Sequence, residues 1–196
     1  HRDLKPENVM LVPDPAVPRG ARVKLLDFGV AKLSHNNTSS MGGGEATAAG
    51  ALLGTPTYMA PEQVQGASKT TDRADVYALG IMAYELLCGQ PPFTGPPFAV
   101  LTKHVQETPV PLSQRAPEVG KGVAALVHRM LAKDTAARPA MRDVAAELSL
   151  LRRVGIAEST EAQLSNVVAQ TVQAALSGHD AAFLHDEQSK IPVPVR

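Results

Sequence analysis

His-Arg-Asp-Leu-Lys-Pro-Glu-Asn, residues 1–8, opens the chain and decides how the remainder is interpreted. Asp-Phe-Gly follows at 27–29 and Ala-Pro-Glu at 60–62, with Asp-Val-Tyr-Ala-Leu-Gly at 75–80 and Lys-Asp-Thr-Ala-Ala-Arg-Pro at 133–139. Any one of these short motifs is common by chance. Together, in this order, they form a specific pattern that predicts both a fold and a chemistry.

The composition is that of a globular protein with no general affinity for polyanions. The 196 residues are 44% hydrophobic and 19% charged, which is enough chain and enough apolar surface for a core. Lys+Arg and Asp+Glu number 19 each, so the formal net charge is zero, and Trp is absent. We therefore expect no nucleic-acid partner and no membrane contact within this chain.

The single cysteine, Cys88, excludes an internal disulfide and indicates a reducing compartment. It lies in an apolar run and is expected to be a buried small hydrophobe. No uninterrupted apolar stretch approaches the ~20 residues that span a bilayer. We expect a cytoplasmic location, although a longer parent protein could be anchored to a membrane beyond the ends of this chain.

The motifs resemble those of eukaryote-like serine/threonine protein kinases of the bacterial type, from residue 1 to about residue 153. The resemblance implies a mainly α fold, the large C-terminal lobe of a kinase, with a short β-hairpin that carries the catalytic and metal loops. The glycine-rich loop and the strand lysine of the family would precede residue 1, so the β-rich N-terminal lobe is expected to be absent. A first residue other than Met also indicates a fragment.

The expected domain organisation is a kinase lobe at 1–153, with its activation segment at 27–62, and an extension at 154–196. In the extension, apolar residues four apart predict a helix at 160–177, followed by a disordered tail. The small, polar, glycine-rich stretch 34–51 is predicted to be a mobile linker, an activation loop, or both. Strands are predicted at 8–12 and 23–26, and helices at 60–65, 72–88, 98–106, 119–133 and 141–151.

The resemblance implies a catalytic centre for phosphoryl transfer. Asp3 would orient the substrate hydroxyl and accept its proton. Lys5, two residues on in an extended segment, would project to the same side and contact the γ-phosphate. Thr55 would hydrogen-bond to both residues and favour Ser or Thr acceptors.

The same resemblance implies ATP and Mg²⁺ as cofactors. Asn8 would bind a second metal ion through its amide oxygen, and Asp27 would be the main ligand, since a hard cation prefers carboxylate oxygen. Met10 would pack beneath the adenine ring.

Further residues are assigned regulatory or structural roles by the resemblance. Arg2 would pair with a phosphorylated activation-loop residue, for which Thr47 is the best candidate and Thr38, Ser39 and Ser40 are weaker ones. The alternative is that Thr47 is an ordinary loop threonine. The expected structural residues are His1 and Phe28 of a hydrophobic spine based on Asp75, which would also bind the catalytic-loop backbone, and a buried ion pair of Glu62 with Arg138.

Two functions remain open at this point. The first is the catalytic lobe of a serine/threonine kinase, which transfers the γ-phosphate of ATP to protein Ser or Thr when completed by a small lobe and is inactive alone. The second is a catalytically inactive, kinase-like interaction module. Intact Asp3, Asn8 and Asp27 favour the enzyme, because a scaffold has no need of magnesium ligands.

Overall fold

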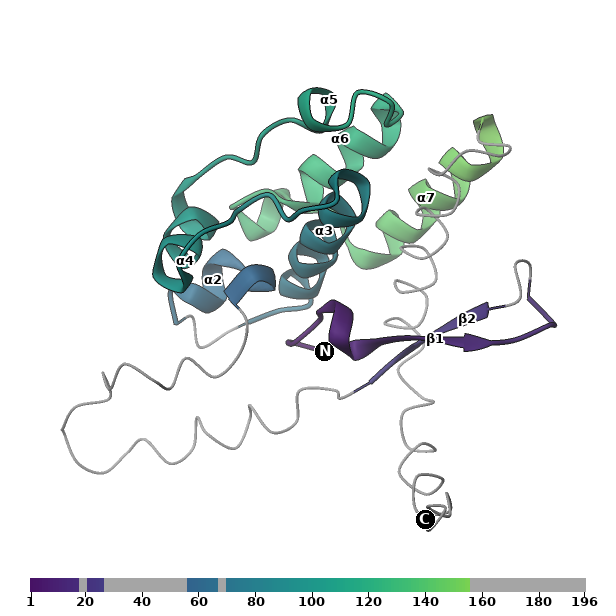
Figure 1. The fold of residues 1–196 in the computed structure, drawn as a ribbon, viewed down its shortest axis with the longest axis horizontal. Helices are drawn as coiled ribbons and strands as arrows, with labels where there is room; N and C mark the ends of the chain where they lie inside the picture. Colours follow the sequence, from purple (N-terminus) through teal and green to yellow (C-terminus); the bar gives the residue numbers. More distant parts are fainter. Residues whose placement is uncertain (18–20, 27–55, 67–69, 156–196) are drawn as a thin grey trace, which may run out of the picture.

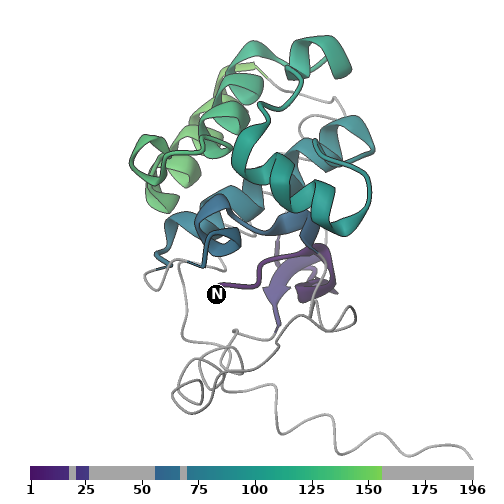
Figure 2. The same ribbon diagram turned by 90° about the vertical axis from the view of Figure 1, so that its left-hand side faces the viewer.

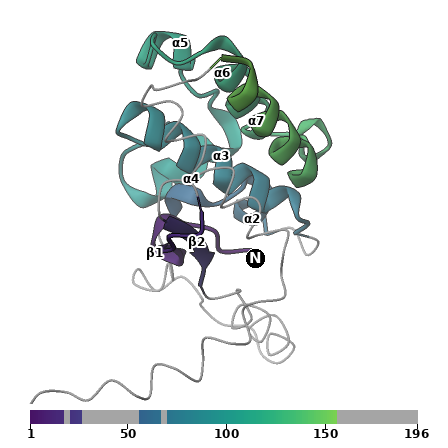
Figure 3. The same ribbon diagram turned by 90° about the vertical axis from the view of Figure 1, so that its right-hand side faces the viewer.

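In the computed structural model the protein is a body of helices with a two-stranded sheet at one end (Figure 1). The structure describes residues 1–17, 21–26, 56–66 and 70–155, and side chains of the last helix as far as Leu151. The predicted loop at 34–51, the predicted helix at 160–177 and the predicted tail lie outside the described residues. Both turned views also place the sheet next to the N-terminus, below the helices (Figures 2 and 3).

The sheet is an antiparallel hairpin that follows a 3₁₀ turn, η1 (Pro6–Asn8). Strand β1 (Val9–Pro13) pairs with β2 (Ala21–Leu25), from Val9 opposite Leu25 to Pro13 opposite Ala21. Both strands lie within one or two residues of the predicted positions. The first strand was predicted to end at residue 12, but Pro13 occupies the last place in the ladder, where a missing donor is tolerated.

Helix α3 (Arg73–Cys88) is the central pillar that the sequence predicted at 72–88. Its side chains are buried from Ala74 to Tyr84, apart from Asp75. It ends at Gly89, whose positive φ of 75° lets its N–H reach the carbonyl of Glu85. At the other end the side chain of Asp72 makes no capping bond, and Thr71 Oγ1 accepts weakly from the Arg73 N–H at 3.4 Å.

The remaining helices surround α3. They are α2 (Pro61–Val64), α4 (Pro97–Gln106), α5 (Leu112–Arg115), α6 (Lys121–Met130) and α7 (Met141–Gly155), with 3₁₀ turns η2 (Pro56–Tyr58) and η3 (Thr135–Ala137). Helix α5 was not predicted, and α6 is shorter than the predicted 119–133. Helix α6 ends early because the chain turns into η3, where Asp134 accepts a bond from the Ala136 N–H. Buried residues of α3, α4, α5, α6 and α7 and of strand β2 belong to a single core cluster.

Two expectations from the sequence, on membrane-spanning segments and on the burial of Cys88, can be compared with the fold. None of the described helices is long and apolar enough to cross a membrane. Cys88, expected to be buried, is only half-buried and packs against the core, where burial raises the pKa of its thiol.

Candidate active site

The loop from His1 to Asn8 is fastened to the first turn of α3 by Asp75. The backbone nitrogens of His1 and Arg2 lie 2.8 Å and 2.7 Å from the two carboxylate oxygens of Asp75. Leu4 is 2% exposed and belongs to the core cluster, so the loop is also held by apolar packing. The expected contact between Asp75 and this loop is therefore present.

Arg2 adopts a backbone conformation that few side-chain-bearing residues tolerate. Its φ is 65°, and among the described residues no other non-glycine residue has a positive φ. Such a conformation typically costs about 1–2 kcal/mol and persists only where neighbours enforce it. Here Asp75 binds the Arg2 N–H, and Gln63 of α2 donates from Nε2 to the Arg2 carbonyl at 3.1 Å.

Asp3 and Lys5 lie side by side at the surface of this loop. The Lys5 ammonium is 3.4 Å from Oδ2 of Asp3, and the two side chains are 25% and 27% exposed. A carboxylate and an ammonium that are both within reach of solute can act together on a hydroxyl and an anionic group.

Asn8 supplies an oriented oxygen next to this pair. It is 7% exposed, and its Nδ2 donates to the backbone carbonyl of Asp3 at 2.8 Å. Because the nitrogen makes that bond, Oδ1 is the atom left to bind a cation. The Asn8 carbonyl also accepts from the Leu26 N–H at 2.9 Å, which brings the residue before Asp27 to the same place.

The donors at this end of the hairpin are oxygen atoms, which is the chemistry that Mg²⁺ prefers. Within the described part of the chain, no group of three or more His, Cys, Asp or Glu side chains could hold a metal ion by itself. Asn8 and Asp3 therefore fit such an ion only as part of a larger ligand set, and Asp27 lies outside the described residues.

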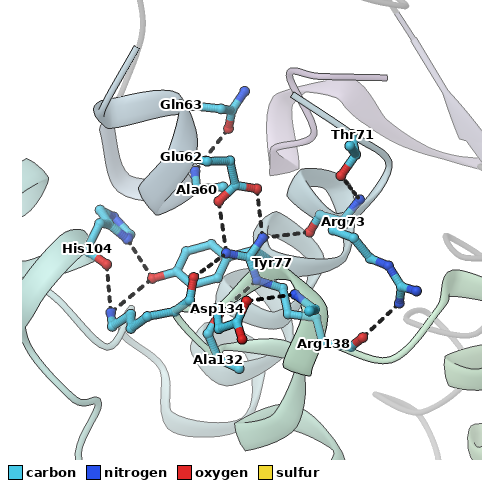
Figure 4. A network of polar contacts seen from close by, with 12 residues as sticks. Ala60, Glu62, Gln63, Thr71, Arg73, Tyr77, His104, Ala132, Asp134 and Arg138 are labelled. Carbon is cyan, nitrogen blue, oxygen red and sulfur yellow. Dashed lines mark hydrogen bonds and ion pairs between the residues drawn. The ribbon is translucent and has the colours of Figure 1, made fainter. Parts of the chain in front are cut away.

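A second polar centre ties α2 to the helical body (Figure 4). Arg138 is 2% exposed and makes two 2.8 Å bonds to the Glu62 carboxylate. Its guanidinium also donates to the carbonyls of Arg73, Ala132 and Lys133 and lies over the Tyr77 ring. The expected ion pair of Glu62 with Arg138 is present, and the guanidinium is saturated with acceptors, as a buried charge must be.

Comparison with known proteins identifies this arrangement. The sequence profile of the protein kinase domain matches residues 1–150. The chain belongs to the protein kinase family.

Relatives of this kinase chain are named as serine/threonine-protein kinases of bacteria. The chain is 42% identical over 142 residues to serine/threonine-protein kinase pkn2 of Myxococcus xanthus, which covers 71% of this chain and 16% of the relative. It is 40% identical over 177 residues to serine/threonine-protein kinase pkn3 of the same organism. This match covers 86% of this chain and 31% of the relative. It is 42% identical over 136 residues to serine/threonine-protein kinase PknB of Mycolicibacterium smegmatis. This match covers 68% of this chain and 20% of the relative. The chain thus spans less than a third of the length of these relatives.

The structure brings together many of the site residues that the sequence singled out for a kinase. Asp3, Lys5 and Asn8 share the loop that begins at His1, and Nε2 of His1 lies 2.8 Å from the Leu26 carbonyl. Met10 is 44% exposed on β1. Seven residues singled out in the sequence lie outside the described residues: Asp27, Phe28, Thr38, Ser39, Ser40, Thr47 and Thr55.

Sequence reasoning missed a buried network on the far side of the Glu62–Arg138 pair in this kinase. The Lys133 ammonium donates to the His104 carbonyl at 2.7 Å and to the Tyr77 hydroxyl at 3.3 Å, and that hydroxyl lies 3.0 Å from Nδ1 of His104. Burial, together with the Lys133 charge, lowers the pKa of His104 to about 4. Burial, together with the Arg138 charge, lowers the pKa of Lys133 to about 8. Only the motif positions of Tyr77 and Lys133 gave any sign of this network, because His104 looks like an ordinary helix-surface side chain in the sequence.

Proposed function

We propose that this chain is the catalytic large lobe of a serine/threonine protein kinase, which transfers the γ-phosphate of ATP to Ser or Thr residues of proteins. The observation that carries the proposal is the short loop on which Asp3, Lys5 and Asn8 contact one another and which Asp75 fastens to the buried helix α3. Phosphoryl transfer needs groups in fixed positions more than it needs covalent chemistry from the protein.

In this proposal each residue of the loop meets one requirement of the reaction. Asp3 accepts the hydrogen bond of the substrate hydroxyl, orients it toward phosphorus and takes its proton as the new bond forms. Lys5, 3.4 Å away, lies against the γ-phosphate and offsets its negative charge. Thr55, which is not part of this loop and lies outside the described residues, would hydrogen-bond to both and favour hydroxyl acceptors.

The nucleotide and its metal would be held from the same end of the hairpin. Asn8, through Oδ1, and Asp27 are the residues that would hold Mg²⁺. When bound, the ion would supply the positive charge that the phosphate oxygens need. Met10 would pack beneath the adenine, and a β-rich small lobe would cover the phosphates from the other side.

The limits of the lobe and its regulation belong to the same proposal. We place the kinase lobe at 1–153, with 154–196 as an extension. Phosphorylation of Thr47 would provide an anionic partner for Arg2, and mass spectrometry of the purified active kinase would detect it.

The test is the replacement of Asp3 by Asn in the kinase expressed together with its small lobe. Phosphate transfer to a protein substrate should fall by about a hundredfold or more, because a general base of this kind contributes that much. Asp143→Asn is the matched control, since that side chain is 61% exposed on α7. Equal transfer by wild type and Asp3→Asn would contradict the proposal. A wild-type protein without any transfer would favour the interaction module.

A further inference from the structure

Gln63 joins two parts of the molecule that are far apart in sequence. Its Oε1 accepts from the Ala60 N–H at 2.9 Å, at the start of α2, and its Nε2 donates to the Arg2 carbonyl at 3.1 Å. Figure 4 shows the first of these bonds, beside Glu62. Because the amide oxygen is fixed by a backbone donor, the amide nitrogen is directed to the carbonyl of the catalytic loop.

The orientation of the Arg2 carbonyl influences the orientation of the Asp3 side chain. That carbonyl belongs to the peptide group between Arg2 and Asp3, so its orientation determines where the Asp3 side chain starts. Asp75 holds the preceding peptide group through the Arg2 N–H at 2.7 Å. Gln63 and Asp75 thus hold the two peptide planes on either side of a residue whose φ is 65°.

Helix α2 is itself anchored to the helical body, so the position of Gln63 is fixed relative to that body. The neighbouring residue, Glu62, is bound by two bonds to the buried Arg138. A movement of α2 would therefore carry Gln63 with it, and the strained Arg2 would lose one of its two restraints.

We propose that Gln63 is a positioning residue for phosphoryl transfer, which couples the position of α2 to the orientation of Asp3. The inference rests on the proposed kinase function and adds a residue to it. Gln63 does not touch the substrate; it acts through the backbone of Arg2. A single hydrogen bond of this kind, partly open to solvent, is expected to affect the rate more visibly than the stability.

Two substitutions test the two hydrogen bonds of the Gln63 side chain, one to Ala60 and one to Arg2. Gln63→Glu keeps an oxygen for the Ala60 N–H but places a second oxygen against the Arg2 carbonyl, which repels it. Gln63→Met keeps the length of the side chain and removes both bonds. Gln65→Glu is the matched control, because Gln65 is exposed at the end of the same helix.

Steady-state kinetics of the complete kinase would test the inference. We expect kcat to fall about three- to tenfold in Gln63→Met, the factor that one hydrogen bond is worth, and further in Gln63→Glu. The KM for ATP should stay within about twofold and Tm within about 3 °C, and Gln65→Glu should match wild type in kcat. An unchanged kcat in both Gln63 variants would overturn the inference, and so would an equal loss of kcat in Gln65→Glu. In either case, phosphate transfer by the wild-type protein would still support the proposed kinase function.

Hydrogen exchange supplies a readout that does not depend on activity. If Gln63 restrains the loop, the Arg2 amide should exchange faster in Gln63→Met than in wild type, because the strained φ can relax once the carbonyl is released. Exchange at the same rate in both proteins would contradict the inference even if the wild-type protein transferred no phosphate.

Discussion

His104 illustrates how a single buried residue can set the pH range of the whole protein. Its side chain is fully buried against Tyr77 and Phe93, with the Lys133 ammonium beside it. Since an ammonium can only donate, the Tyr77 hydroxyl accepts from Lys133 and is free to donate its own proton to Nδ1 of His104. This chain of bonds requires a neutral imidazole.

The first prediction concerns stability in mild acid. The pKa of His104 is about 4 in the folded protein and about 6.5 when unfolded. The unfolded state therefore binds the extra proton between these values, and stability present above pH 6.5 is lost as the pH falls toward 4. The loss between pH 7 and pH 5 should be about 2 kcal/mol from this residue.

Urea unfolding at pH 7, 6 and 5 would measure this loss, with His104→Gln as the comparison. The variant should be less stable at pH 7 but should show a flatter dependence on pH. His128, whose pKa burial also lowers, is present in both proteins and cancels. Lys133, with a pKa of about 8, stays charged throughout this range. Parallel curves would show that His104 does not carry the effect.

The residues that the sequence could predict are those that chemistry confines to a motif. Asp3, Asn8 and the Glu62–Arg138 pair stand at fixed distances from recognisable neighbours, so a single sequence is enough to single them out. Gln63 and His104 act through contacts with segments 61 and 27 residues away. No local pattern encodes such contacts, and a glutamine after Pro-Glu looks like any polar helix residue.

At the scale of elements, helices with a strong apolar signal were predicted well. Helix α3 was predicted within one residue because it is apolar nearly all round and is followed by glycine and proline. Helix α5 was missed because it has four residues, too few for a periodic signal, and is held by tertiary contacts. One such contact is the bond from the Leu112 N–H to Nε2 of His128.

The second prediction concerns the crossing of α3 and α6 at Gly80. A Cβ added there would lie 3.0 Å from Cβ of Met130 and 3.0 Å from Cδ2 of Leu131, both buried. An added methyl group would require these neighbours to move by a few tenths of an ångström, and Cβ of Met130 moves only with its backbone. Gly80→Ala should therefore lower the free energy of unfolding by about 1–2 kcal/mol in spite of the better helix propensity of alanine.

Gly122→Ala is the matched comparison for Gly80→Ala. Gly122 also lies inside a helix, α6, but the atom nearest to an added Cβ is the terminal Cδ2 of Leu151, which can rotate away. Its effect in urea unfolding should be within about 0.5 kcal/mol of zero or slightly stabilising. Equal losses of stability in the two variants would contradict the prediction. They would show that the mobility of the contacted atom does not decide the cost of an added methyl group.

At the scale of the whole molecule, the helices form the packed body, and the loop before the hairpin presents the candidate catalytic residues. The loop bearing Asp3 is connected to the helical body by its own Leu4, which lies in the core, and by Asp75 and Gln63 from two other segments of the sequence. The motif order predicted that these segments belong to one lobe. It could not predict that Arg2 would be strained or that α2 would hold it, because both depend on how separately folded elements meet.

The last prediction concerns the nucleotide. A small-molecule site normally encloses about 70–90% of its ligand, whereas the hairpin presents Met10 and Leu11 at 44% and 57% exposure. We therefore expect residues 1–196 alone to bind ATP at least about a hundredfold more weakly than the same chain joined to a small lobe, since an open face recovers only part of the contact energy. Calorimetry with ATP and Mg²⁺ would measure both affinities.

Two substitutions in the joined protein would identify the face that binds adenine. Consecutive strand residues point to opposite faces, so Met10 and Leu11 offer a matched pair. Met10→Asp should weaken ATP binding about tenfold or more by placing a charge against the base, and Leu11→Asp should leave the affinity within about twofold. If Leu11→Asp were the more damaging change, the adenine would lie on the opposite face of the hairpin, and the role proposed for Met10 would be wrong.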